Sequence, residues 1–487
     1  MTTDAQERFT AGTVATRNAD LVGAALAQAG VDPVRFADTS SLREIVAIRQ
    51  EDLPRAREAL TSLEPGLAAE RAGAAVSLGE GLAALERDPS GTVLRLYRPV
   101  GDPTGNLVLG GDLGCELQVW APYPGPGEAA GPGAAPTHYQ APRPTPYGRW
   151  FAAGVFDPGV PWTPPAPVDA VDFPIDVVYT WVDDTDPTWA AQRDAAMREA
   201  GRLPVHASSV GAARYRNRDE LRYSLRSLEL FAPFVRHVFL VTADQVPDWL
   251  VADPDRLTVV PHRDIFADPA NLPTFNSHSI EAHLHRIEGL AEHYLYLNDD
   301  VIFGRPVHPR LFFEPNGLHR FFLSRAQIPY GPTREDDIGI DAAAKNGRRL
   351  LEEAFGRRVT QKFKHGPHAQ RRSLLAEVGQ RFPEQVRATA ASRFRHPDDY
   401  SVPASLAHHY AYLQGLALPG ELRYDYIHLA DLERTEQRFA ALLAERDRDA
   451  VCINDSDVGP EAEARVDELV HDFLERYLPV PSSFERA

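Results

Sequence analysis

The sequence predicts an α/β protein whose main domain is built on a mainly parallel sheet. Between residues 175 and 301, short apolar runs typical of buried strands alternate with stretches whose apolar residues recur at helical spacing. Two of these runs, 175–182 and 294–297, are followed closely by acidic residues. Open α/β sheets bind ligands at the carboxyl ends of their strands. We therefore expect a Rossmann-like domain with an active site at that edge of the sheet.

Composition limits the classes of partner. Lys and Arg total 51 against 69 Asp and Glu, and the net charge of −18 disfavours binding to nucleic acid and anionic membrane surfaces. Cys115 and Cys452 lie far apart in the chain, so we expect neither a disulfide framework nor a thiolate zinc site. The acidic first residues and the lack of an apolar run of ~20 residues predict a soluble cytoplasmic protein without a transmembrane segment. Peripheral membrane association stays open.

The chain is expected to divide into three segments. Residues 1–120 predict a small α/β domain of unknown role, with a helix that Asn18 or Asp20 caps and Gly30 ends. Further elements are expected there: a helix at 52–63 and strands at 44–48, 92–97 and 116–120. Residues 121–167 are rich in Pro, Gly and Ala, which predicts an extended linker. The catalytic domain is expected over 168–487.

The catalytic domain shows an alternation of strands and helices. After the strand at 175 we expect helices at 219–231, 247–250, 276–287 and 466–477, strands at 238–242, 257–260 and 294–297, and an exposed loop at 333–349. No Gly-x-Gly-x-x-Gly follows any of these strands and no P-loop is present, which disfavours dinucleotide and P-loop sites. His278, His283 and His285 lack a metal-binding spacing and are expected to be structural or to contact substrate.

Polar residues mark the candidate active site. Asn298, Asp299 and Asp300 follow the apolar run from Tyr294, where a carboxylate needs a metal, a cation or hydrogen bonds to offset its burial. A plain Asx-type turn is the alternative. Val451–Asp455 is a short strand with a similar ending.

Two cationic segments are candidates for phosphate contact. The segment Lys362-Phe-Lys-His-Gly-Pro-His368 combines two lysines with two histidines, which suits a phosphate and general-base cluster. Arg222 recurs with Arg218 and Arg226 along one helical face, and either touches a ligand phosphate or belongs to a solvated face.

Four blocks, in this order along the chain, resemble the Stealth family. They are Ile175-Asp-Val-Val-Tyr-Thr-Trp-Val with Thr185-Asp-Pro; Asp219-Glu-Leu-Arg-Tyr-Ser-Leu-Arg-Ser-Leu, Phe275-Asn-Ser-His and Tyr296-Leu-Asn-Asp-Asp; His365-Gly-Pro-His with Phe394-Arg-His-Pro-Asp-Asp; and Cys452-Ile-Asn-Asp-Ser. The family contains bacterial capsular-polysaccharide phosphotransferases and the catalytic subunit of the animal lysosomal-enzyme N-acetylglucosamine phosphotransferase. Asp184 stands where the family usually has glycine, and residues 1–167 lie outside the resemblance.

The resemblance implies transfer of a sugar 1-phosphate from a UDP- or CDP-sugar to a polysaccharide hydroxyl, with release of a nucleoside monophosphate. It also implies a fold of the GT-A nucleotide-sugar transferase type and a divalent metal, Mg²⁺ or Mn²⁺, which prefers oxygen ligands. Asp300 and Asp455 are the first metal-ligand candidates and Asp299 the third. Asp299 and Asp300 point to opposite faces of a strand, so both can bind one metal only if the chain turns there.

The same resemblance suggests roles for other residues. His365 is expected to be the general base and Arg395 to hold the transferred phosphoryl group. Asp176, Thr180, Trp181 and Asp186 are expected to bind the nucleoside, with Trp181 as a core residue being the alternative. Further substrate-contact candidates are Arg222, Asn276, Lys362 and His368. A metal-dependent glycosyltransferase releasing a nucleoside diphosphate, or a non-enzymatic glycan-binding module, would share many of these features.

Overall fold

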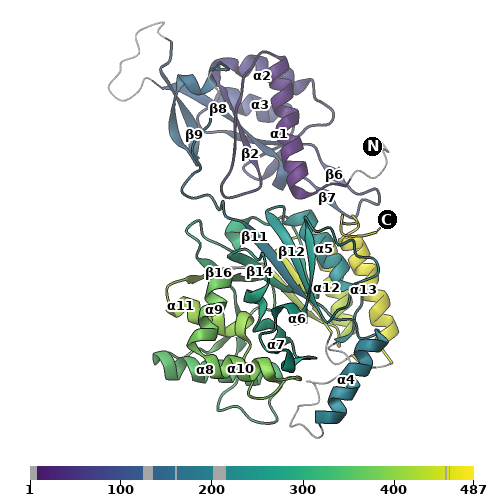
Figure 1. Ribbon diagram of the computed structural model, residues 1–487. Coiled ribbons are helices and arrows are strands. Elements are labelled where there is room, and N and C mark those ends of the chain that lie inside the picture. The colour runs from purple at the N-terminus through teal and green to yellow at the C-terminus, as the bar shows by residue number, and fades with distance from the viewer. Residues whose placement is uncertain are drawn as a thin grey trace. The chain divides into compact units, whose positions relative to one another are not determined.

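The computed structural model describes residues 8–123, 135–159, 162–200, 215–455, 458–459 and 461–486. The chain divides into two compact units: Met1–Ala170 with Pro306–His308, and Val171–Arg305 with Pro309–Ala487. Within the described ranges, no helix has the length and apolar character needed to span a membrane. Figure 1 shows the chain coloured from its N-terminus in purple to its C-terminus in yellow.

The first unit is an α/β unit built on one large sheet. Its strands follow the order β1-β2-β8-β5-β3-β4, and β9 and β10 extend the sheet from β8. The strands are β1 (Val34–Ala37), β2 (Glu44–Arg49), β3 (Ala68–Arg71), β4 (Ala74–Val76), β5 (Val93–Tyr97), β8 (Cys115–Tyr123), β9 (His138–Thr145) and β10 (Gly148–Ala152), with a separate small pair β6 (Val100–Gly101) and β7 (Val108–Leu109). The helices are α1 (Ala11–Gln28), α2 (Leu53–Thr61) and α3 (Leu78–Arg87), and their apolar side chains share a core with β2, β5 and β8.

Two expectations for the first unit are wrong. The first helix starts at Ala11, because Thr10 caps it in a reciprocal pair with Thr13, whereas Asn18 is buried and donates to the Leu113 carbonyl. The second is the linker: β9 and β10 lie within 121–167 and belong to the first unit. Their aromatic side chains form a core with β8, in which Trp120 stacks on Phe151 at 4.1 Å. Residues 124–134 and 160–161 of the expected linker lie outside the described residues.

The second unit contains the predicted parallel sheet. Its strand order is β13-β12-β11-β14-β19, and every pair is parallel except the one between β14 and β19. The strands are β11 (Ile175–Thr180), β12 (Val235–Thr242), β13 (Leu257–Pro261), β14 (His293–Asn298) and β19 (His368–Arg371). Thr180 pairs with Asn298, so the carboxyl ends of β11 and β14 lie together. The predicted α/β class with a mainly parallel sheet is confirmed.

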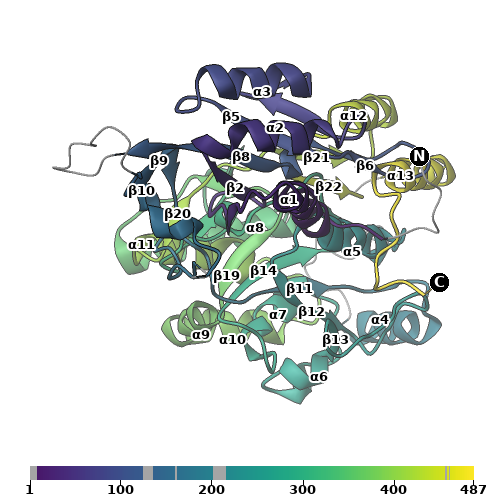
Figure 2. The ribbon, with the colours of Figure 1, turned by 90° about the horizontal axis from the view of Figure 1, so that it is seen from above.

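Helices flank this sheet on two sides. In Figures 1 and 2, α9 to α11 lie on one side, and α5, α12 and α13 on the other. Their bounds are α4 (Pro187–Ala200), α5 (Glu220–Phe231), α6 (His262–Ile265), α7 (Ser277–Glu281), α8 (Gly339–Phe355), α9 (Arg372–Arg381), α10 (Pro383–Ala391), α11 (Ala407–Leu413), α12 (Leu432–Glu445) and α13 (Glu463–Tyr477). Two expectations fail here. Residues 247–250 form no helix, and most of the expected loop at 333–349 is α8, whose buried residues include three alanines and two leucines.

A smaller sheet lies next to the carboxyl end of β14. Its order is β15-β22-β21, with β15 (Val301–Phe303) antiparallel to β22 (Ala450–Asn454) and β21 (Tyr424–His428) parallel to β22. Short pairs β16 (His319–Phe321) with β20 (Ala417–Pro419), and β17 (Leu323–Gln327) with β18 (Gln361–Phe363), complete the unit. The turn between β14 and β15 therefore joins the two sheets, and it carries Asp299 and Asp300.

Candidate active site

Asp300 lies at the centre of a cluster of functional side chains. The Cys452 thiol donates a hydrogen bond to Asp300 Oδ2 at 3.3 Å, and His365 Nε2 lies 3.5 Å from Asp300 Oδ1. Asp300 Oδ1 is buried and accepts no hydrogen bond from the described residues. One ligand atom from each of the three side chains lies within 4.8 Å of the others. Three segments far apart in the sequence thus meet at one carboxylate.

The two sheets determine this meeting. Cys452 pairs with Val301 across β15 and β22, which places its side chain beside the turn that carries Asp300. His365 lies between β18 and β19, and β19 pairs with β14. The His365 carbonyl accepts a hydrogen bond from the Tyr424 hydroxyl at 2.5 Å, so β21 also holds this segment.

Two further carboxylates enlarge the acidic cluster. Burial, together with the nearby charges of Glu220 and Asp300, holds the pKa of Asp299 well above its usual range. Burial raises the pKa of Glu220 to about 7, with a contribution from Asp300. Glu220 is the first residue of α5, and its carboxylate accepts a hydrogen bond from the Arg218 backbone N–H at 2.6 Å. Such mutual repulsion is what a divalent cation relieves. Glu220 was not among the residues predicted for the site.

The acidic residues fit a divalent metal. Asp455 Oδ1, like Asp300 Oδ1, is buried without a hydrogen bond from the described residues, while Asp455 Oδ2 accepts one from Arg216 at 3.3 Å and one from Arg218. Carboxylate oxygens are the ligands that Mg²⁺ and Mn²⁺ prefer. Burial and the neighbouring Asp300 hold the pKa of the Cys452 thiol far above its usual range, and a protonated thiol is a poor ligand for these ions. We therefore favour aspartate oxygens over the sulfur, and Asp300 is the aspartate that the structure places in the cluster.

Asp300 also controls the charge of His365. Burial alone lowers the pKa of this imidazole, but the negative charge of the adjacent Asp300, with a further contribution from Glu281, raises it above its usual value. The histidine therefore binds a proton more readily than a free imidazole does. That property suits a group that receives a proton from a reacting hydroxyl.

A second polar chain connects the end of β11 to Arg395. Thr180 Oγ1 lies 3.1 Å from the Tyr296 hydroxyl, and that hydroxyl donates to Glu281 Oε1 at 3.2 Å. Glu281 Oε2 and Arg395 Nε are both buried without a hydrogen bond from the described residues. Glu281 interacts electrostatically with both Arg395 and His365, and Arg395 Nη2 donates to Ser277 Oγ at 2.8 Å. Glu281 is a site residue that the sequence reasoning missed, because it was assigned to an ordinary helix.

Comparisons with known proteins now bear on this geometry. Four family models match: Stealth protein CR1, conserved region 1, at residues 173–201; CR2, conserved region 2, at 214–321; CR3, conserved region 3, at 364–412; and CR4, conserved region 4, at 440–487. An exopolysaccharide phosphotransferase of Streptomyces coelicolor is 45% identical over 486 residues, covering 96% of this chain and 82% of that protein. The chain belongs to the Stealth family.

Two other comparisons cover a smaller part of this chain. The exopolysaccharide phosphotransferase CpsY of Mycobacterium tuberculosis is 39% identical over 320 residues, which cover 65% of this chain and 59% of that protein. The solved structure of the galactosyltransferase LgtC with donor and acceptor sugar analogues matches 61% of this chain at 14% identity and a TM-score of 0.30. A likeness that weak carries no argument about this protein.

All four Stealth regions place side chains around the clusters described above. Region 1 contributes Thr180; region 2 contributes Glu220, Glu281, Asp299 and Asp300; region 3 contributes His365 and Arg395; and region 4 contributes Cys452 and Asp455. The second unit contains every one of these residues. Asp299 and Asp300 lie in a turn and not in a strand, so their side chains need not point to opposite faces of a sheet. Binding of one metal by both aspartates therefore stays a prediction.

Trp181 and Asp186 of the first Stealth region were both predicted to bind the nucleoside, but their hydrogen bonds differ. Trp181 is buried, and its Nε1–H has no acceptor among the described residues; the same is true of Thr242 Oγ1 at the end of the neighbouring strand β12. Both atoms are free to bond to a nucleoside, so the contact between Trp181 and the nucleoside stays a prediction. Asp186 instead caps α4 by accepting from the Thr188 backbone N–H at 2.8 Å, and it also accepts from Gln245 at 3.1 Å. A structural role accounts for Asp186.

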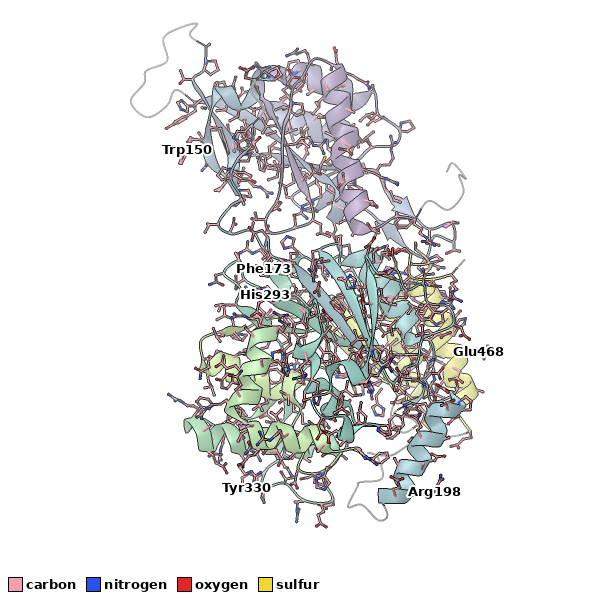
Figure 3. The ribbon with its side chains drawn as sticks, in the orientation of Figure 1. Trp150, Phe173, Arg198, His293, Tyr330 and Glu468 are labelled. Carbon is pink, nitrogen blue, oxygen red and sulfur yellow. The ribbon has the colours of Figure 1, made fainter. Side chains whose placement is uncertain are left out.

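The predicted nucleoside contact of Asp176 is wrong. Asp176 lies near the amino end of β11, about four residues or ~13 Å from Thr180 along the strand. Its carboxylate is completely buried and accepts two hydrogen bonds from Arg236, at 2.8 and 2.6 Å, and one from the Ala291 backbone N–H at 2.7 Å. The same end of the sheet contains His293, which stacks on Phe173 (Figure 3).

Three more residues predicted to contact substrate have partners within the protein. Arg222 donates to Glu485 at 2.8 Å and lies over the Trp249 ring. Lys362 pairs with Asp341. Asn276 is fully buried, caps α7, and donates to Asp399 at 2.8 Å and to the Phe394 carbonyl at 3.3 Å. Asn276 therefore holds the segment that carries Arg395 and does not face a ligand.

His368 belongs to a buried histidine chain and not to the site. His368 Nδ1 lies 3.1 Å from His408 Nε2, and His408 Nδ1 lies 3.4 Å from His319 Nε2. Burial lowers the pKa of His368 to about 3 and that of His319 to about 3. Both side chains therefore stay neutral in the folded protein across the usual pH range.

The buried histidines should make the folded protein less stable in acid. Below pH ~6.5 the unfolded histidines bind protons that the folded ones do not, so each should remove about 1.4 kcal/mol of stability per pH unit as the pH falls toward 3. Glu220 acts oppositely and offsets about one histidine between pH ~7 and ~4.5, since its folded pKa is raised. Denaturant unfolding at pH 7 and pH 5 should show a smaller loss in His319→Gln, which cannot titrate. An unchanged pH slope in that variant would contradict the prediction.

Proposed function

We propose that this Stealth protein transfers a sugar 1-phosphate from a UDP- or CDP-sugar to a hydroxyl of a polysaccharide, in capsule or cell-surface polysaccharide synthesis. Its relatives named exopolysaccharide phosphotransferases support a phosphotransferase role. The observation that carries the proposal is the placement of His365 beside the unpaired oxygen of Asp300, with Glu281 interacting with both His365 and Arg395. An acid cluster, a proton acceptor and a guanidinium are the groups that phosphoryl transfer requires.

The donor side of the reaction rests on the acidic cluster. Asp300 and Asp455 each offer a buried, unpaired oxygen that would hold Mg²⁺ or Mn²⁺, with Asp299 as a further candidate. The bound ion would neutralise the charge of the donor diphosphate. Trp181 and Thr242, at the ends of neighbouring strands, offer buried polar atoms to the nucleoside. These atoms would otherwise remain without partners in the folded protein.

The transfer side rests on His365 and Arg395. The acceptor hydroxyl gives its proton to the imidazole of His365, and its oxygen forms a bond to the β-phosphorus. The bond from that phosphorus to the bridging oxygen breaks, and the nucleoside monophosphate leaves with the bridging oxygen. Arg395 binds the transferred phosphoryl oxygens, because a planar guanidinium can donate two parallel hydrogen bonds. Glu281 keeps that guanidinium oriented through its charge.

The identity of the released nucleotide tests this proposal. The full chain is mixed with Mn²⁺ or Mg²⁺, a panel of UDP- and CDP-sugars and polysaccharide acceptors, and the products are separated by chromatography. We expect a nucleoside monophosphate that appears only when acceptor is present. Release of a nucleoside diphosphate would instead assign the site to glycosyl transfer. Absence of turnover with every pair would favour a binding module.

A further inference from the structure

The small sheet β15-β22-β21 places two side chains behind the reacting groups, and the proposed reaction gives neither of them a task. Cys452 on β22 contacts Asp300, and Tyr424 on β21 contacts the backbone of His365. We propose that Cys452 and Tyr424 are positioning residues that orient Asp300 and His365 for metal and substrate. This inference rests on the proposed function for the reaction, and on the geometry of the chain for the orientation.

Cys452 bonds to one oxygen of Asp300 and leaves the other oxygen unpaired. Its side chain is fully buried, and pairing to both β15 and β21 fixes its backbone. The thiol donates to Oδ2 at 3.3 Å, while Oδ1 stays unpaired on the side of His365 Nε2. A carboxylate free to rotate would exchange its two oxygens. A donor fixed in a strand selects one orientation, as hydrogen bonds behind metal ligands commonly do.

Tyr424 fixes the segment that carries His365. Its hydroxyl donates to the His365 carbonyl at 2.5 Å. A Cβ atom at Gly366 would come within 3.5 Å of the Tyr424 ring, so the ring packs closely on this segment. Lys364 Nζ donates to the Leu422 carbonyl at 2.7 Å, just before β21. The segment around His365 is thus held by Tyr424 on β21 and by Leu422 just before that strand.

Two other roles for Cys452 make different predictions. If the residue only fills space in the core, alanine and serine should change stability without changing metal binding. If the sulfur itself binds the metal, serine should weaken binding as much as alanine does. In the positioning role a hydroxyl can replace the thiol as donor, so serine should largely restore what alanine loses. Cys115, fully buried in the core of the first unit, provides the matched control.

Mn²⁺ binding to the full chain tests this without requiring turnover. Electron paramagnetic resonance gives the dissociation constant of Mn²⁺, and thermal unfolding verifies that each variant is folded. We expect Cys452→Ala to weaken Mn²⁺ binding by ~10- to 100-fold, Cys452→Ser to stay within a few-fold of the parent, and Cys115→Ala to match the parent. Tyr424→Phe keeps the ring and removes one hydroxyl. It should lower kcat by ~10-fold at an unchanged KM for the donor.

The outcomes are separable. Mn²⁺ affinity in Cys452→Ala equal to that of the parent, equal losses in the serine and alanine variants, or absence of Mn²⁺ binding by the parent would each overturn the role of Cys452. Unchanged kcat in Tyr424→Phe would overturn the role of Tyr424. If Cys452→Ala fails to fold, Cys452→Val, which fills the space without a hydrogen-bond donor, takes its place in the Mn²⁺ measurement. A parent chain that binds Mn²⁺ but releases no nucleotide would refute the proposed reaction alone, because the affinities still test the positioning.

Discussion

Replacing His365 with alanine is expected to lower kcat by ~10²-fold or more, because the acceptor hydroxyl loses the group that takes its proton. In the parent, the pH profile of kcat should fall on its acidic side with a pKa above ~6.5, since Asp300 raises the pKa of this histidine and only the neutral imidazole accepts a proton. The rate of nucleoside monophosphate release, measured from pH 5.5 to 9, gives both quantities. The alanine variant should lose that acidic limb.

His368 is the matched control for this experiment. It belongs to the same His-Gly-Pro-His segment, but it is buried and its Nδ1 lies 3.1 Å from His408 Nε2. His368→Gln should reduce thermal stability and change kcat by no more than a few-fold. Near-parental turnover in His365→Ala would remove His365 as the base, and equal losses of kcat in both variants would mean that the whole segment, and not one imidazole, is responsible.

The main sheet could be predicted because its signals are local. The runs at β11 and β14 are mainly apolar, as is typical of strands covered on both faces, and each is followed by acidic residues. The linker error has a local cause as well. β9 contains Pro142 and Pro144, which counted against a strand, yet β9 pairs with β8 and β10 at the side of the sheet. Tertiary pairing therefore overrides composition in this segment.

In the candidate site, too, local motifs could be predicted and contacts between distant residues could not. Asp300, His365 and Arg395 were identified from local motifs and lie around the proposed reaction centre. Assignments failed where a partner distant in sequence satisfies the side chain: Arg236 neutralises Asp176 from 60 positions away, and Glu485 binds Arg222 from 263 positions away. No spacing pattern in one sequence encodes such pairs. Glu281 was missed for the converse reason, because folding leaves one of its oxygens unpaired.

Glu485→Ala is expected to destabilise the second unit by about 3–5 kcal/mol. Glu485 and Arg226 are both buried and make two hydrogen bonds of 2.9 Å, and Glu485 also accepts from the Ser482 backbone N–H at 2.8 Å. Removing the carboxylate leaves the buried Arg226 guanidinium with two unmade hydrogen bonds and with only Glu475, at 3.4 Å, as counter-charge. Thermal unfolding and hydrogen exchange of the α5 amides would report the loss.

An exposed ion pair provides the comparison that isolates burial. Arg465 and Glu436 lie 2.7 Å apart with side chains 67% and 45% exposed, so Glu436→Ala should cost less than about 1 kcal/mol. If both variants lose the same small amount, the C-terminal pair contributes no more than a surface contact. A large loss confined to Glu485→Ala would mean that the last residues of the chain hold α5 in place. Glu220 begins that helix in the acidic cluster, so Mn²⁺ binding should then weaken together with the stability.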